Sequence, residues 1–270
     1  MATLLVLMLT ACARAVAGVA EPGARPCAPA AEDPTPGPPS TPTDAPVITV
    51  DDRVGFWIPN AHSAPLGLAV YADGTVIRAE GAGSHAEPLP RMVIGRIDAC
   101  QVREAVDALI ALAGVDFGMP EVTDLGTMTV IVTRPGSGKV ILSAYGLGIG
   151  DEYLAHTQAQ ARATLTATIN AIQNATSAEG PWTPNRLQLT RFEREASGPA
   201  LRWPLADSIS DVLHRRTDRE LPCGVVDGAD AAAVAAALNG GPALSLWGDG
   251  SDPATLAVGV LIPGQPACAG

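Results

Sequence analysis

The hydrophobic pattern of the chain becomes regular at about residue 47. Residues 4–9 are apolar, and residues 13–46 are rich in Pro, Ala, Thr and Gly with neither a period of 2 nor a period of 3.6. Such a Pro-rich composition favours extended polyproline II and cannot bury a core. From Val47 onward, apolar residues alternate or recur at helical spacing. The pattern therefore predicts a folded body behind a Pro-rich stalk.

The first half of the body is expected to contain two hairpins, each followed by a helix. Asp73-Gly74 lies between two β-rich runs, where Asp-Gly is typical of a tight hairpin turn. Asp98 with Gln101 resembles a capping box at the start of the first helix. The expected strands cover residues 66–71, 75–81, 127–133 and 140–145, and the expected helices cover residues 97–114 and 151–175.

The second half is expected to form a second small module. "EGPWTPN" at residues 179–185 is typical of a boundary, and Gly240-Gly241 ends a predicted helix over residues 228–239. Strands are expected at residues 185–193, 221–226, 243–247 and 255–262. This order predicts an α+β fold of two modules, residues 47–178 and 179–270, each an antiparallel sheet with helices packed on one face.

Composition limits the classes of partner. In a chain of 270 residues, hydrophobic residues make up 47% and charged residues 17%, as in a globular protein. Aromatic residues make up only 4%, so the core must consist mainly of Val, Leu, Ile and Ala. The formal net charge is −11, and Lys139 is the only lysine. Nucleic acid is therefore excluded as an expected partner, since binding to it requires basic side chains that neutralise phosphates.

The apolar stretch at residues 4–9 ends in "LTAC" at Cys12. It is too short to span a bilayer, which needs about 20 residues, but it fits the apolar region of a signal peptide. Leu9-Thr10-Ala11-Cys12 resembles a bacterial lipobox. The resemblance implies a lipoprotein signal peptide over residues 1–12 and acylation of Cys12, palmitate included. No Lys or Arg precedes the stretch, so an imperfect signal and a start codon further upstream are both left open.

The body resembles a set of uncharacterised envelope domains of actinobacterial lipoproteins. The resemblance covers about half of the chain and is carried by the "VYADGT" hairpin, the helix after it, the hairpin "TVIVTRPGSGKVILSAYG" and the closing helix. These motifs are structural. The resemblance therefore implies a fold and a lipid-anchored location at the extracytoplasmic face of the cell membrane, but no activity.

Four cysteines remain when Cys12 is assigned to the lipid. Cys223 and Cys268 flank the C-terminal segment, and a disulfide between them would tie down a terminus that otherwise frays. The chain-entropy estimate for such a loop is about 4 kcal/mol. Cys27 and Cys100 could also pair, with a buried free thiol at Cys100 as the alternative.

"YGLGIGDE" is the best candidate for a ligand loop because it lies between a predicted strand and a predicted helix. Backbone amides at the start of a helix can hold an anion, and Gly146, Gly148 and Gly150 would let a ligand approach closely. Asp151 and Glu152 oppose this interpretation because they place negative charge where an anion would bind. A flexible loop without a ligand is the alternative.

No other motif predicts chemistry. "RPGSGK" lacks the first glycine and the final Ser/Thr of a phosphate-binding loop, whose positions are taken by Thr133 and Val140. The four histidines show no metal-ligand spacing, and there is no Gly-x-Ser-x-Gly motif. No catalytic residue, no metal ligand and no cofactor is predicted.

The leading hypothesis is a lipid-anchored, non-enzymatic binding or scaffold module of the cell envelope. Its partner would be an envelope protein or a cell-wall component. The alternatives are an envelope hydrolase with a dispersed active site and an inhibitor or regulatory subunit of another envelope enzyme. An enzyme should show a concave site where groups of perturbed pKa converge, whereas a binding module should show an exposed apolar or aromatic patch.

Overall fold

The computed structural model describes residues 41–53, 66–80, 89–134, 138–192, 198–214, 221–248 and 253–268. All of them belong to one compact unit, residues 32–270. The expected signal peptide, Cys12, Cys27 and most of the stalk lie outside the described residues.

The larger sheet has seven strands, and every pair of neighbours is antiparallel. Its order is β6-β5-β1-β2-β3-β4-β7. Both expected hairpins are confirmed, with Val70 opposite Val76 in one and Ile131 opposite Ile141 in the other. The strands are β1 (Ile48–Arg53), β2 (Leu66–Val70), β3 (Thr75–Glu80), β4 (Arg91–Arg96), β5 (Thr127–Arg134), β6 (Gly138–Tyr145) and β7 (Ser177–Trp182).

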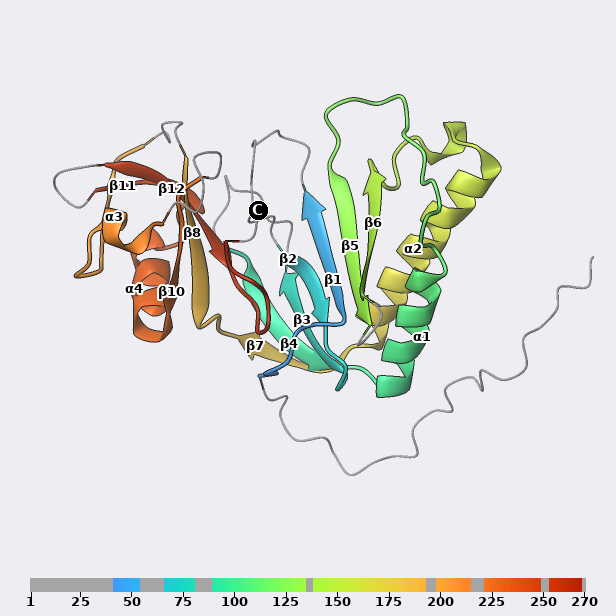
Figure 1. Ribbon diagram of the computed structural model, residues 1–270, viewed down its shortest axis with the longest axis horizontal. Helices are drawn as coiled ribbons and strands as arrows, with labels where there is room; N and C mark the ends of the chain where they lie inside the picture. The colour runs from blue at the N-terminus through green and yellow to red at the C-terminus, as the bar shows by residue number, and fades with distance from the viewer. Residues whose placement is uncertain are drawn as a thin grey trace, which may run out of the picture. The chain divides into compact units, whose positions relative to one another are not determined.

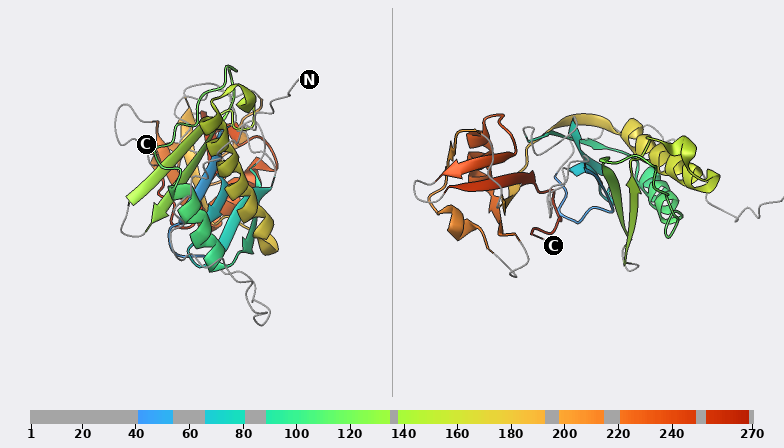
Figure 2. Two further views of the ribbon diagram at one scale, coloured as in Figure 1. Left: turned by 90° about the vertical axis from the view of Figure 1, so that its right-hand side faces the viewer. Right: turned by 90° about the horizontal axis from the view of Figure 1, so that it is seen from above.

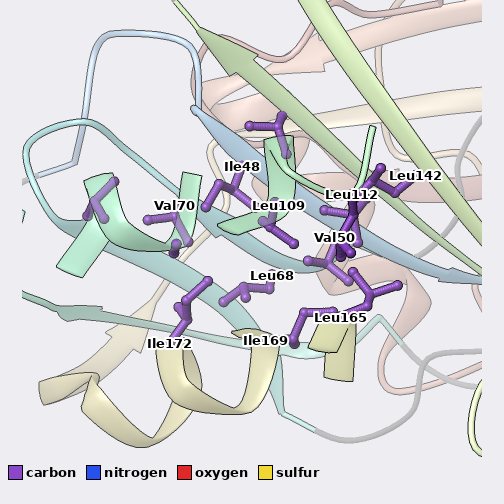
Figure 3. Close-up of a cluster of buried hydrophobic side chains, with 14 of the residues drawn as sticks. Ile48, Val50, Leu68, Val70, Leu109, Leu112, Leu142, Leu165, Ile169 and Ile172 are labelled. Carbon is purple, nitrogen blue, oxygen red and sulfur yellow. The ribbon is translucent and has the colours of Figure 1, made fainter. Parts of the chain in front are cut away.

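Helices α1 (Ala99–Ile110) and α2 (His156–Ala175) cover one face of this sheet, on the same side of its strands (Figures 1 and 2). The capping box is confirmed: Asp98 accepts from the backbone N–H of Cys100, and Gln101 accepts from that of Asp98. Between the helices and the sheet lies a core of aliphatic side chains (Figure 3). Its members include Ile48, Val50, Leu68, Val70, Leu109, Leu112, Leu142, Leu165, Ile169 and Ile172.

The expected second helix begins later than predicted. Residues Asp151–Tyr153 form a separate 3-10 turn (η1), and α2 begins only at His156. Gly150 has a φ of 69°, and Leu154 and Ala155 are extended, so the chain changes direction before the helix starts. The helical periodicity of the sequence could not show this break.

The smaller sheet has five strands in the order β10-β8-β12-β11-β9. Its strands are β8 (Arg186–Phe192), β9 (Leu201–Arg202), β10 (Cys223–Asp227), β11 (Leu244–Gly248) and β12 (Ala254–Val260), with helices α3 (Ile209–Val212) and α4 (Gly228–Leu238). The expectation of a purely antiparallel sheet is wrong here, because β9 and β11 pair in parallel. Parallel pairing needs a long crossover, and the chain through α3, β10 and α4 supplies it. The α+β class is confirmed.

The C-terminal segment links the two sheets. Ile262 is fully buried against Ala69, Tyr71, Ile77 and other apolar residues, and the Tyr71 hydroxyl donates to the carbonyl oxygen of Pro263 at 3.1 Å. The boundary expected at residue 179 lies inside β7, which pairs with β4 of the larger sheet.

The disulfide expected between Cys223 and Cys268 is present, with a Cα–Cα distance of 5.7 Å. The backbone N–H of Cys268 also donates to Gln188 Oε1 at 2.8 Å. Cys100 is disulfide-bonded too, so the free-thiol alternative for that residue is wrong.

Candidate interaction surface

Two loops meet at one end of the larger sheet. The first, residues 111–126, joins α1 to β5, and the second, residues 146–155, joins β6 to α2. They lie together because Thr127 at the start of β5 is paired with Tyr145 at the end of β6 (Figure 1). The first loop has sixteen residues without helix or strand. Ordered loops of this length are uncommon and tend to be functional.

A fully buried arginine of α2 holds both loops. Arg162 has no exposed side-chain surface, and its Nε donates to Asp151 Oδ1 at 2.6 Å. Nη1 donates to the carbonyl oxygen of Phe117 at 3.2 Å, and Nη2 donates to those of Tyr145 at 2.9 Å and Gly146 at 2.6 Å. A buried cation is tolerated only when it is paired and hydrogen-bonded, and here both loops supply the partners.

Asp116 fixes the first loop to the start of α2. Its carboxylate accepts from the backbone N–H of Gly118 and from Gln158 Nε2, both at 2.8 Å. These two donors, the backbone N–H first, lower the pKa of the Asp116 carboxyl because they bind its charged form. Farther along the loop, the backbone N–H of Leu125 donates to the Tyr145 hydroxyl at 3.0 Å. The loops are therefore positioned by polar contacts along their length.

The three glycines of the predicted ligand loop allow the two loops to pack closely. Gly146, Gly148 and Gly150 all have positive φ, at 56°, 82° and 69°. A Cβ atom on Gly146 would lie 2.5 Å from Leu125 Cδ1, and one on Gly150 would lie 3.1 Å from Pro120 Cβ. A Cβ on Gly148 would meet nothing within 4 Å. Two of the glycines thus serve a packing role.

The geometry adds no support for an anion at this loop. The guanidinium of Arg162 is already hydrogen-bonded to Asp151 and to three backbone carbonyls. Neither loop contains a Lys or another Arg. Anion binding at the glycines stays a prediction.

Five large apolar side chains of the two loops are exposed to solvent, Val115 at 39% among them, and we call the other four the loop patch. Their exposed fractions are 81% for Tyr153, 73% for Met119, 48% for Ile149 and 40% for Val122. They are grouped around the contact between Pro120 and Gly150: a Cβ on Gly150 would lie within 4 Å of Val122 and Tyr153. Contiguous exposed apolar patches mark interaction sites on soluble proteins.

Among the described residues, no group of three or more His, Cys, Asp or Glu could hold a metal ion. The pKa of Asp116 is lowered, and that of Tyr71 is raised by burial and then by the charge of Asp73. Tyr71 lies on the far face of the sheet against Ile262, whereas α2 packs on the other face.

Sequence reasoning found part of this surface. It singled out the glycines and placed Asp151 and Glu152 at the start of a helix, but it missed Arg162 and the loop patch. One signal was available: Arg162 is the only Lys or Arg in the twenty residues of α2, and it lies beside Ala161 on the apolar stripe. A lone charge at a core position predicts a buried ion pair. The exposed apolar side chains gave no such signal.

Comparison with known proteins identifies no family. No protein-family model matches the chain, and neither the curated proteins nor the solved structures contain a match to it. In the described part of the chain, no helix combines the length and apolar character needed to cross a membrane. Function must therefore be argued from the geometry of the loops.

Proposed function

We propose that the protein is a lipid-anchored, extracytoplasmic binding or scaffold module of the cell envelope, and that the loop patch is its binding surface. The observation that carries this proposal is the exposed apolar group Met119, Val122, Ile149 and Tyr153 on loops that Arg162 holds in place. A partner that covered these side chains would remove apolar surface from water, which stabilises a complex.

The lipobox-like sequence ending at Cys12 supports the proposed location, and so do the disulfides of the folded body. Cys223 is bonded to Cys268, and Cys100 is also in a disulfide. Structural disulfides are typical of exported proteins because the cytosol keeps thiols reduced. A stalk of the length of residues 13–46, fully extended at about 3.1 Å per residue, would let the body reach on the order of 100 Å from the membrane.

Rigidity supports binding by this surface. A flexible loop loses conformational entropy when it binds, whereas a loop already ordered by buried hydrogen bonds does not. The first loop is held by Arg162 at Phe117, by Gln158 at Asp116 and by Tyr145 at Leu125. The exposed side chains are thus presented on a preorganised backbone.

The proposal is tested by photocrosslinking in cells. A photoreactive amino acid at position 153 should give a discrete adduct in the membrane fraction, whereas the same group at Gln160, which is exposed on α2, should not. Cys12→Ser should move the protein out of the membrane fraction.

Equal adduct formation at both positions, or none at either, would contradict the loop patch as a binding surface. Unchanged fractionation of Cys12→Ser would contradict the lipid anchor. An inhibitor or regulatory subunit would bind its enzyme through the same surface. The enzymatic turnover of the captured partner, measured with and without this chain, distinguishes such a subunit from a scaffold.

A further inference from the structure

We infer that the partner of the loop patch is a protein whose binding surface has an apolar centre bordered by Lys and Arg. This inference rests on the proposed function and specifies the chemistry of the partner. It is carried by the charges that surround the patch.

The two loops that carry the loop patch are acidic, and we call their exposed carboxylates its acidic border. The two loops contain five carboxylates and no Lys or Arg. The one cation that contacts them from α2 is Arg162. Asp151 is neutralised by Arg162, which leaves four exposed carboxylates. They are Asp116, Glu121, Asp124 and Glu152.

One of these carboxylates is stabilised in its charged form. The pKa of Asp116 is lowered by its two hydrogen-bond donors, so it remains ionised well into the acid range. His156, the first residue of α2, is also exposed next to the second loop.

Charge complementarity argues for a basic partner and against two other occupants. A second copy of this chain docked patch to patch would place carboxylates against carboxylates, and like charges across an interface are unfavourable. An anionic lipid surface would be repelled for the same reason. Lys and Arg around an apolar pocket would instead pair with the carboxylates while the pocket receives the apolar side chains.

The apolar centre and the acidic border should contribute in different ways. Tyr153 and Met119 are the most exposed members of the patch, and aromatic side chains in the middle of interfaces commonly supply most of the binding energy. Charges at the edge mainly raise the association rate and select the partner, and their effect weakens with salt.

The test uses two designed amphipathic peptides as probes for the full chain carrying Cys12→Ser, purified without detergent. The peptides share a leucine face, which is flanked by Lys in one and by Glu in the other. We expect the Lys-flanked peptide to bind at least about tenfold more tightly, with an affinity that falls as salt rises. Tyr153→Ser should weaken its binding by about tenfold or more.

Two matched charge reversals distinguish binding by the acidic border from a general attraction of the Lys-flanked peptide to a negatively charged protein. Glu121 lies beside the patch, and Asp230 is exposed on α4. Glu121→Lys and Asp230→Lys change the net charge of the protein by the same amount. We expect the first to weaken binding of the Lys-flanked peptide about tenfold more than the second. Equal affinities for the two peptides, or equal effects of the two reversals, would overturn the inference.

The other occupants are tested directly. Sedimentation of the Cys12→Ser chain with vesicles that contain phosphatidylglycerol, lost when Tyr153→Ser is added, would overturn the inference in favour of a membrane. Dimerisation in analytical ultracentrifugation, lost in the same variant, would overturn it in favour of a second copy. If the adduct at position 153 forms but the peptides bind equally, the proposed function stands and this inference alone fails.

Discussion

At position 162, a buried guanidinium lies where the helical spacing of α2 would place an apolar side chain. The charge is accommodated because Asp151 and three carbonyl oxygens accept its hydrogen bonds. Those carbonyls belong to Phe117 and Gly146 of the two loops and to Tyr145, the last residue of β6. The Gly146 oxygen also accepts from the backbone N–H of Ile149 at 3.0 Å. One side chain thus satisfies the backbone of both loops.

Replacement of Arg162 by methionine is expected to destabilise the protein by about 3 kcal/mol. The methionine would fill the volume but leave Asp151 without its cation and remove the Arg162 donors from the carbonyl oxygens of Phe117, Tyr145 and Gly146, of which Gly146 keeps the N–H of Ile149. Loss of hydrogen bonds to buried groups is costly. Urea denaturation measures the change in the free energy of unfolding.

Asp151→Asn is the matched control for the charge. The amide oxygen can still accept from Nε of Arg162, so we expect a smaller loss of about 1 kcal/mol. If Arg162→Met were as stable as wild type, apolar packing alone would hold the loops, and the role given to Arg162 would be wrong.

At the scale of elements, the two loops can pack closely because a glycine lies at their point of contact. Gly146 and Gly148 both have positive φ, but only Gly146 has a neighbour in the position that a Cβ would take. That neighbour, Leu125, belongs to the first loop. The glycine spacing of "GLGIG" therefore reflects both backbone conformation and loop packing.

Alanine substitutions separate these two effects. Gly148→Ala should cost about 1 kcal/mol, since it introduces only the strain of a left-handed conformation. Gly146→Ala should cost about 3 kcal/mol because overpacking against Leu125 is added to the same strain. Thermal or urea unfolding of the two variants gives the comparison, and equal losses would show that the contact with Leu125 is easily relieved.

At the scale of the whole molecule, the C-terminal segment is fixed by several independent contacts. Ile262 packs in the cluster on the larger sheet, Pro263 accepts from Tyr71, and Cys268 is bonded to Cys223 of the smaller sheet. The disulfide closes a loop with a sequence separation of 45 residues. Loss of the disulfide should therefore affect the smaller sheet and the segment that connects it to the larger one.

Replacement of both Cys223 and Cys268 by alanine is expected to lower the free energy of unfolding by about 4 kcal/mol, because the unfolded chain regains the freedom that the cross-link removes. Unfolding of oxidised wild type and of the variant in urea measures this difference. Unchanged stability would show that the noncovalent contacts of residues 262–268 suffice to hold the segment.

Much of the fold could be predicted from the sequence because its signals are local. Asp73-Gly74 specified one hairpin, Asp98 with Gln101 specified the start of α1, and the positions of Cys223 and Cys268 indicated their disulfide. Each signal depends on residues close together in the chain or on the chemistry of a single residue type. Hydrogen bonds between neighbouring residues, and the spacing of side chains along a helix or strand, depend little on the rest of the fold.

The remaining features were decided by contacts between distant segments. The place of β1 between β5 and β2, and the parallel pairing of β9 with β11, depend on which distant strands bury the same apolar face. The loop patch likewise arises because β5 and β6 bring two loops together beside Arg162. Periodicity fixes the face that each element buries, but only the packed chain fixes what lies against that face and which apolar side chains remain in water.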